Sequence, residues 1–186
     1  DVILNLLDMP NIDIDINIQD MDGRTALMYL CENYKINGIQ TCKQFEEDRD
    51  KINNIALKLL QIKDIDVNIQ DKNGNTALME SCKGYHIWIL STRPEVNINL
   101  QNNKGETALI LCCKYKKSIN FKCLLERTEI NINIQDKYGN TALMYAITDK
   151  IIFYANHLLT KTDIDINLQD NYGDTVLIQF CKRYSD

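Results

Sequence analysis

One phrase of fourteen residues recurs five times along this 186-residue chain, and it constrains the fold more than any other feature. The copies read DINIQDMDGRTALM at 15–28, DVNIQDKNGNTALM at 66–79, NINLQNNKGETALI at 97–110, NINIQDKYGNTALM at 131–144 and DINLQDNYGDTVLI at 165–178. Their glycines are spaced by 51, 31, 34 and 34 residues. The chain is therefore built from internal repeats with a period of 34 residues, and one repeat carries an insertion while another carries a deletion.

Each copy predicts the same local structure. An alternating apolar and polar stretch leads into a turn where the glycine supplies a positive φ, so we expect a hairpin-like tip. The threonine two residues after each glycine is a good N-cap for a first helix. Seventeen residues after the threonine of the regular units comes a leucine pair, beginning at Leu124 and at Leu158, which predicts a second helix.

A unit of this kind cannot bury its apolar face alone, so neighbouring units must stack into an elongated array. We expect a mainly α solenoid of stacked helix-turn-helix units with β-hairpin-like tips. Its predicted units are a partial unit at 1–14, a unit with an inserted, elongated second helix at 15–65, a short unit at 66–96, regular units at 97–130 and 131–164, and a partial unit at 165–186. The partial units predict a segment of a longer protein, or a chain that associates through its ends.

This pattern resembles the ankyrin repeat, whose unit has a D-x-x-G turn, a T-P-L-H helix start and a paired-leucine second helix. The resemblance covers nearly the whole chain and implies an ankyrin-repeat solenoid that binds proteins. Alanine or valine stands in place of the family's proline, and methionine or isoleucine in place of its histidine, as at Met28 and Met144. The hydrogen bonding that this histidine makes at the helix start is therefore expected to be absent.

Two units depart from the regular length. About seventeen extra residues precede the leucine pair Leu59 and Leu60, and Thr41 followed by Gln44 is a capping-box pattern. We predict an elongated second helix from about Cys42 to Ile62, which is either a tolerated insertion or a docking lever. In the next unit three residues are missing around 83–87, which predicts a bend or gap in the array.

Most residues that could act in catalysis or metal binding recur with the period of the repeat. Four cysteines lie six residues after the threonines of their units: Cys31, Cys82, Cys113 and Cys181. We expect these cysteines to pack as small apolar residues between helices. Cysteines of neighbouring units should be too far apart to form a disulfide. The two histidines, His86 and His157, lie in helical contexts without a nucleophile beside them. We predict no catalytic residue, no metal site and no cofactor, and therefore no enzyme.

Charge and cysteine usage restrict the partners. A net charge of −5 argues against nucleic acid and anionic membranes, and no apolar run is long enough to insert into a bilayer. The seven cysteines do not have the spacing of a secreted disulfide scaffold, so we expect reduced thiols in an intracellular, cytosol-like compartment. The abundance of isoleucine, asparagine and lysine is compatible with a virus, parasite or symbiont.

The resemblance also implies where a partner binds, namely a concave groove formed by the tips and the exposed side of the first helices. Residue matching gives the candidates Arg24, Tyr29, Lys72, Asn75, Glu80, Lys104, Glu106, Leu111, Lys137, Tyr138, Tyr145 and Tyr172. We expect a protein-interaction scaffold or adaptor without a small-molecule substrate. The alternatives are the substrate-selecting module of a larger enzyme, or a ubiquitin-ligase-type adaptor, whose active part lies outside this segment; nucleic-acid binding is the least favoured.

Two asparagines have two readings. Asn68 and Asn167 lie in a pattern that resembles ankyrin sites for asparaginyl hydroxylation. The alternative is a structural asparagine that forms hydrogen bonds within the hairpin, and this alternative explains the residue without a modification.

Overall fold

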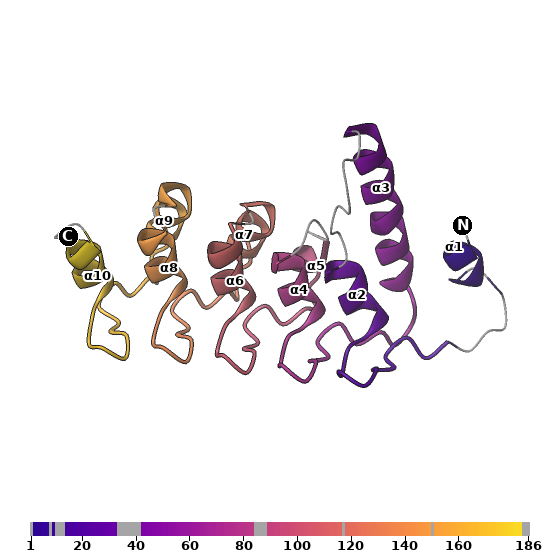
Figure 1. The fold of residues 1–186 in the computed structure, drawn as a ribbon, viewed down its shortest axis with the longest axis horizontal. Coiled ribbons are helices and arrows are strands. Elements are labelled where there is room, and N and C mark those ends of the chain that lie inside the picture. Colours follow the sequence, from indigo (N-terminus) through magenta and orange to yellow (C-terminus); the bar gives the residue numbers. More distant parts are fainter. Residues whose placement is uncertain are drawn as a thin grey trace.

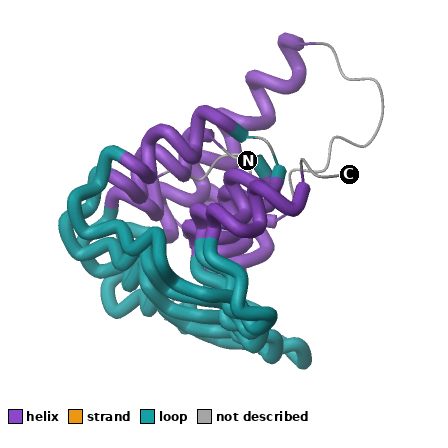
Figure 2. Tube along the Cα trace, turned by 90° about the vertical axis from the view of Figure 1, so that its left-hand side faces the viewer, coloured by secondary structure: helices purple, strands orange, loops and turns teal. Residues whose placement is uncertain are grey.

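The structure is a computed structural model that describes residues 2–7, 9, 14–32, 42–83, 89–116, 118–149 and 151–183. These residues form an elongated array of helices, in which the chain advances unit by unit from one end to the other (Figure 1). The tips lie along one edge of the array and the helices along the other (Figure 2). The fold is the helical solenoid that the repeat predicts.

A first helix follows every tip. These helices are α2 (Ala26–Glu32), α4 (Ala77–Lys83), α6 (Ala108–Tyr115), α8 (Ala142–Thr148) and α10 (Val176–Arg183). In each unit the threonine Oγ1 accepts the backbone N–H three residues later, at 3.3 to 3.4 Å. The predicted N-caps are therefore confirmed, and they fix where every first helix begins.

The second helices form another row. They are α1 (Val2–Leu7), α3 (Cys42–Leu59), α5 (Ile89–Thr92), α7 (Ser118–Leu125) and α9 (Ile152–Leu159). Helix α3 has 18 residues and extends well beyond its neighbours (Figure 1), ending three residues before the predicted Ile62. Helix α5 is a single turn, while residues 84–88, where we expect the shortened connection, lie outside the described part of the chain.

Each tip is closed by two backbone hydrogen bonds. In the fourth tip, for example, the N–H of Asp136 donates to the carbonyl of Asn140 at 3.0 Å, and the N–H of Gly139 donates to the carbonyl of Asp136 at 2.9 Å. All five tip glycines have φ between +72° and +80°, the left-handed region that glycine adopts without strain. The tips are hairpin-like turns, and in the described residues the β-structure is limited to one isolated bridge between Gln169 and Thr175.

Asparagine side chains join each unit to the next. Asn99 Nδ2 donates to the carbonyl of Glu129 at 2.7 Å, while Asn99 Oδ1 accepts the backbone N–H of Asn131 at 2.9 Å. Asn17, Asn68 and Asn133 make the same pair of bonds to their own following units. Asn68 therefore has a structural role, but its side chain bonds to the following unit and not within its own hairpin as predicted.

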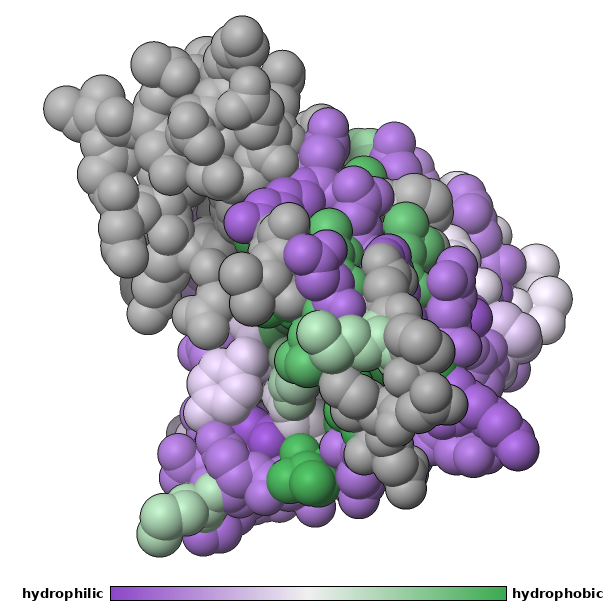
Figure 3. Space-filling view, turned by 90° about the vertical axis from the view of Figure 1, so that its right-hand side faces the viewer, coloured by the Kyte–Doolittle hydropathy of each residue, from purple (hydrophilic) through white to green (hydrophobic). Residues whose placement is uncertain are grey.

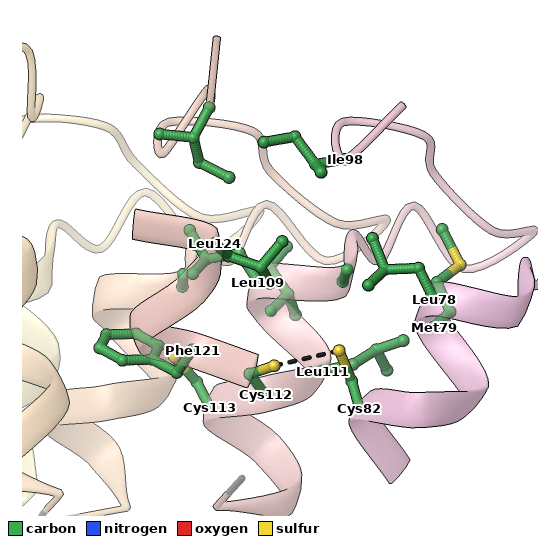
Figure 4. Close-up of a cluster of buried hydrophobic side chains, with 14 of the residues drawn as sticks. Leu78, Met79, Cys82, Ile98, Leu109, Leu111, Cys112, Cys113, Phe121 and Leu124 are labelled. Carbon is green, nitrogen blue, oxygen red and sulfur yellow. Dashed lines mark hydrogen bonds between the residues drawn. The ribbon is translucent and has the colours of Figure 1, made fainter. Parts of the chain in front are cut away.

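The core lies between and within the helix rows. Phe121 and Leu124 of the second-helix row pack with Leu109 and its equivalents in the first helices (Figure 4). The repeat cysteines Cys31, Cys82 and Cys113 are fully buried, as expected for small hydrophobes, while Cys181 in α10 is exposed.

One cysteine contact has no counterpart in the repeat pattern. Cys112, one residue before the repeat position, places its Sγ 3.1 Å from the Sγ of Cys82 in the preceding first helix (Figure 4). Burial raises the pKa of the Cys112 thiol well above its usual value. The Cys112 thiol is therefore neutral, and it packs against the buried Cys82 as a small apolar group.

Candidate functional site

Tips and first helices enclose a hollow near the middle of the array. A pocket of about 310 Å³ lies between the second and third tips and the C-terminal ends of α4 and α6. It is lined by Asn73, Asn75, Lys83, Asn102, Asn103, Lys104, Glu106 and Tyr115. This central pocket lies on the side that the resemblance assigns to partner binding, and its lining is mostly polar.

The fourth residue of a first helix holds its own tip. Tyr29 donates its hydroxyl to Asp20 Oδ2 at 2.6 Å, and Tyr145 makes the equivalent bond to Asp136 Oδ2 at 2.6 Å. The bond from Tyr29 is the main cause that holds the pKa of Asp20 below its usual range. Burial, assisted by the bond to Asp136, raises the pKa of Tyr145.

Ion pairs also span from tip to helix. The residue after the tip glycine meets the seventh residue of the first helix in three units: Arg24 with Glu32 at 2.6 Å, Glu106 with Lys114, and Asp174 with Lys182 at 2.6 Å. The cations of two of these pairs also lie over tyrosine rings. The Arg24 guanidinium lies 4.3 Å from the Tyr29 ring centroid, and Lys114 Nζ lies 4.9 Å from that of Tyr145.

The exposed candidates are concentrated at the tips. Tyr172 is 88% exposed and Tyr138 is 52% exposed. The side chains of Lys72, Lys104 and Lys137 are exposed as well. Tyr29 is at the border of exposure, whereas Arg24 and Tyr145 are half-buried against their tips.

Four other candidates are buried: Asn75, Glu80, Glu106 and Leu111. The expectation that Glu80 and Leu111 face an open groove is wrong, since they are 4% and 1% exposed. Both lie in first helices packed between two neighbouring first helices, which cover a side chain of this length. The longer Tyr145 ring, at the same helix position, still reaches the surface in part.

Two helix residues of the central pocket are absent from the candidates named on sequence. Lys83 lies seven residues after Thr76, and Tyr115 lies eight residues after Thr107. Since residues at helical spacings of three and four share a face, both follow the fourth position by one turn. The helix register therefore indicates both residues, which lie one turn beyond the positions that the family resemblance gives.

Among the described residues, no three or more His, Cys, Asp and Glu side chains form a group that could hold a metal ion. No helix in the described ranges is both long and apolar enough to cross a membrane. His157 is exposed with Nδ1 2.8 Å from the carbonyl oxygen of Phe153, and His86 lies outside the described residues.

The two ends of the array expose apolar side chains. The N-terminal end shows apolar surface among polar surface (Figure 3). In the first tip, Ile18 and Met21 are exposed. At the other end Leu177 of α10 is 67% exposed, whereas the equivalent Leu109 and Leu143 are buried. The difference follows from stacking, because internal first helices are covered on both sides.

Comparison with known proteins agrees with this architecture. A family profile described as ankyrin repeats (3 copies) matches residues 87–170, while no curated protein matches the sequence. The crystal structure of EF0377, an ankyrin repeat protein, is similar with a TM-score of 0.72 and 18% identity, covering 97% of this chain and 84% of that one.

The ankyrin repeat domain of Bcl-3, described as a unique member of the IkappaB protein family, is also similar. Its TM-score is 0.68 at 20% identity, and the match covers 90% of this chain and 68% of the Bcl-3 chain. The family profile spans the third and fourth tips, and the same tip, cap and helix recur in all five copies. Residues 87–170 of this chain therefore match ankyrin repeats, and the chain has the ankyrin-repeat fold along nearly its whole length.

Proposed function

We propose that this chain is a non-catalytic scaffold or adaptor that binds a partner protein through the groove formed by its tips and first helices. Ankyrin repeats are in general protein–protein interaction modules. The thiols of Cys31, Cys82, Cys112, Cys113 and Cys123 are free, which fits the reducing intracellular compartment that we also propose.

The observation that supports this proposal is that recurring and variable residues of a tip have different roles. Residues that recur in all five tips are engaged in holding the array: Gln101 Nε2, for example, donates to the carbonyls of Gly105 and Gln135 at 2.8 and 3.1 Å. Several residues that differ between tips, such as Lys104 and Tyr138, are exposed. A surface that varies over an invariant frame is suited to recognition.

Tyr138 and Tyr172 are the best anchors on this surface. Tyrosine is enriched among the residues that dominate binding energy at interfaces. Tyr29 and Tyr145 are also tyrosines, but their hydroxyls already donate hydrogen bonds to the tip aspartates. The exposed pair can therefore be changed without disturbing a tip.

The test is binding of a purified partner, first identified by capture on the wild-type chain. Tyr138→Ala with Tyr172→Ala should weaken that binding at least about tenfold, since anchors of this kind are each worth roughly 1 to 2 kcal/mol. Ile152→Ala is the matched control, because Ile152 is 72% exposed on the second helix α9. Unchanged affinity in the double variant, or loss only in the control, rejects the groove.

A further inference from the structure

We propose that a basic strip formed by Lys72, Lys104 and Lys137 docks an extended acidic segment of the partner protein. The strip crosses the second, third and fourth tips of the groove. The inference rests on the proposed function, because it names the chemistry of the partner that the groove takes.

The three lysines belong to adjoining backbone segments. Asn103 Nδ2 donates to the carbonyl of Lys72 at 2.9 Å, which places the second tip directly beside the third. The backbone N–H of Lys137 donates to the carbonyl of Lys104 at 2.9 Å, which does the same for the third and fourth. The strip is therefore a continuous surface, and all three side chains on it are exposed.

The lysines of the strip keep their positive charge available. Among the ion pairs of the described residues, other groove cations are engaged: Arg24 with Glu32, Lys83 with Glu80, Lys114 with Glu106, and Lys182 with Asp174. None of those pairs includes a lysine of the strip. The Nζ of Lys137 lies 4.9 Å from the Tyr138 ring centroid.

Acidic groups at these three tips face inward. Asp71 and Asp136 are 8% and 6% exposed. Each uses Oδ1 to accept two backbone N–H groups of its own tip. The third tip has Asn102 where the others have aspartate, so it carries no carboxylate there. The middle of the groove is locally positive although the chain as a whole is negative.

The outer tips have the opposite character. Asp20 and Asp22 are exposed in the first tip, and the fifth tip carries Asp170 and Asp174. Like charges across an interface are costly and opposite charges steer encounter, so an acidic segment is directed to the three middle tips. The charge pattern thus selects both the partner's chemistry and its position along the array.

The dimensions set the length of the segment. Neighbouring units stack at interhelical distances of about 8 to 10 Å, so three tips span roughly 20 Å. An extended chain rises about 3.3 Å per residue, and the segment that covers them has about six or seven residues.

The test uses the full chain and two fluorescent ten-residue peptides, one with glutamate at every third position and one with glutamine there. We expect the glutamate peptide alone to bind, with an affinity that falls as salt is raised. Lys72→Gln, Lys104→Gln and Lys137→Gln together should weaken this binding at least tenfold, and Lys104→Glu alone should weaken it clearly. All three side chains are exposed, so the variants should keep the wild-type circular dichroism and melting temperature.

The matched control combines Lys51→Gln, Lys63→Gln and Lys122→Gln, which remove the same charge on or next to α3 and α7. It should bind the glutamate peptide as the wild type does. Equal binding of both peptides, an unaffected strip variant, or tighter strip-dependent binding of a single-stranded RNA probe overturns the proposal. Groove-dependent partner capture without binding of the acidic peptide rejects this inference and leaves the proposed function standing.

Discussion

Tyr145 in α8 donates its hydroxyl to Asp136 Oδ2 in the preceding tip, at 2.6 Å. The other oxygen of Asp136 accepts the backbone N–H groups of Tyr138 and Asn140 at 2.9 and 3.0 Å. One buried carboxylate therefore closes the turn and ties it to the helix. Met144 stands where the family has histidine, and only its Sδ meets the N–H of Thr141, at 3.5 Å. The bond between Tyr145 and Asp136 thus joins tip and helix in a unit that lacks the family's histidine.

Tyr145→Phe tests this link. The substitution removes a hydrogen bond to a buried carboxylate, and such bonds are worth about 1.5 to 3 kcal/mol. We expect the free energy of unfolding, measured in urea, to fall by that amount. Tyr138→Phe is the control, because the exposed Tyr138 hydroxyl forms no hydrogen bond to a tip among the described residues. It should change stability by less than about 0.5 kcal/mol. Equal effects of the two substitutions would contradict the assignment.

A pair of glycines isolates the contact between neighbouring tips. A Cβ on Gly139 would lie 2.7 Å from Asp170 Cα, whereas on Gly173 the nearest atom is Gln169 Nε2 at 4.0 Å. Their φ values are +80° and +79°, so alanine pays the same conformational cost of about 1 to 2 kcal/mol at both. Overpacking adds about 1 to 3 kcal/mol at Gly139 alone. Calorimetry should show Gly139→Ala melting well below Gly173→Ala, and similar melting temperatures would refute close tip stacking.

A pair of asparagines tests the bonds between units. Asn99→Ala leaves the carbonyl of Glu129 and the N–H of Asn131 without their side-chain partner. We expect a loss of about 2 kcal/mol in unfolding free energy, since two hydrogen bonds are removed. Asn167 is exposed and makes no such bridge within the described residues, so Asn167→Ala should cost less than about 0.5 kcal/mol. If Asn167→Ala is as damaging, the bridge is not what stabilises the array.

Acid should weaken the third unit through Glu106. Burial favours its protonated form, but the hydrogen bonds from Asn102 and Lys114 outweigh burial and lower the pKa of Glu106. Because the folded pKa is the lower one, the contribution is complete above the unfolded value of about 4.3 and is lost as pH falls through the folded pKa. Urea midpoints between pH 7 and pH 3 should therefore fall less for Glu106→Gln than for the wild type. Parallel curves for the two proteins would show that Glu106 is not responsible.

Features set by neighbours in the sequence were predictable. Thr107 caps α6 and Gly105 takes a positive φ because each needs only its own few residues to do so. The burial of Cys113 was predictable as well, since its place in the helix register recurs from unit to unit. In all three cases the periodicity carries the information.

Features set by contacts between units were not predictable in the same way. Arg127 donates to the carbonyls of Ser91, Arg93 and Val96, more than thirty residues earlier, and no motif marks it. The burial of Leu111 likewise depends on how tightly its helix is covered by two neighbours. Helix register places a residue on a face, but only the packed array decides whether that face remains open.

The most direct test of partner binding in the groove is photo-crosslinking of the full chain to its purified partner. Tyr138 at a tip and Ile152 on a second helix, 52% and 72% exposed, are each replaced by a photo-crosslinking amino acid in separate variants. Partner binding through the groove predicts a covalent adduct from position 138 and none from position 152. An adduct from position 152 with none from position 138 would contradict it.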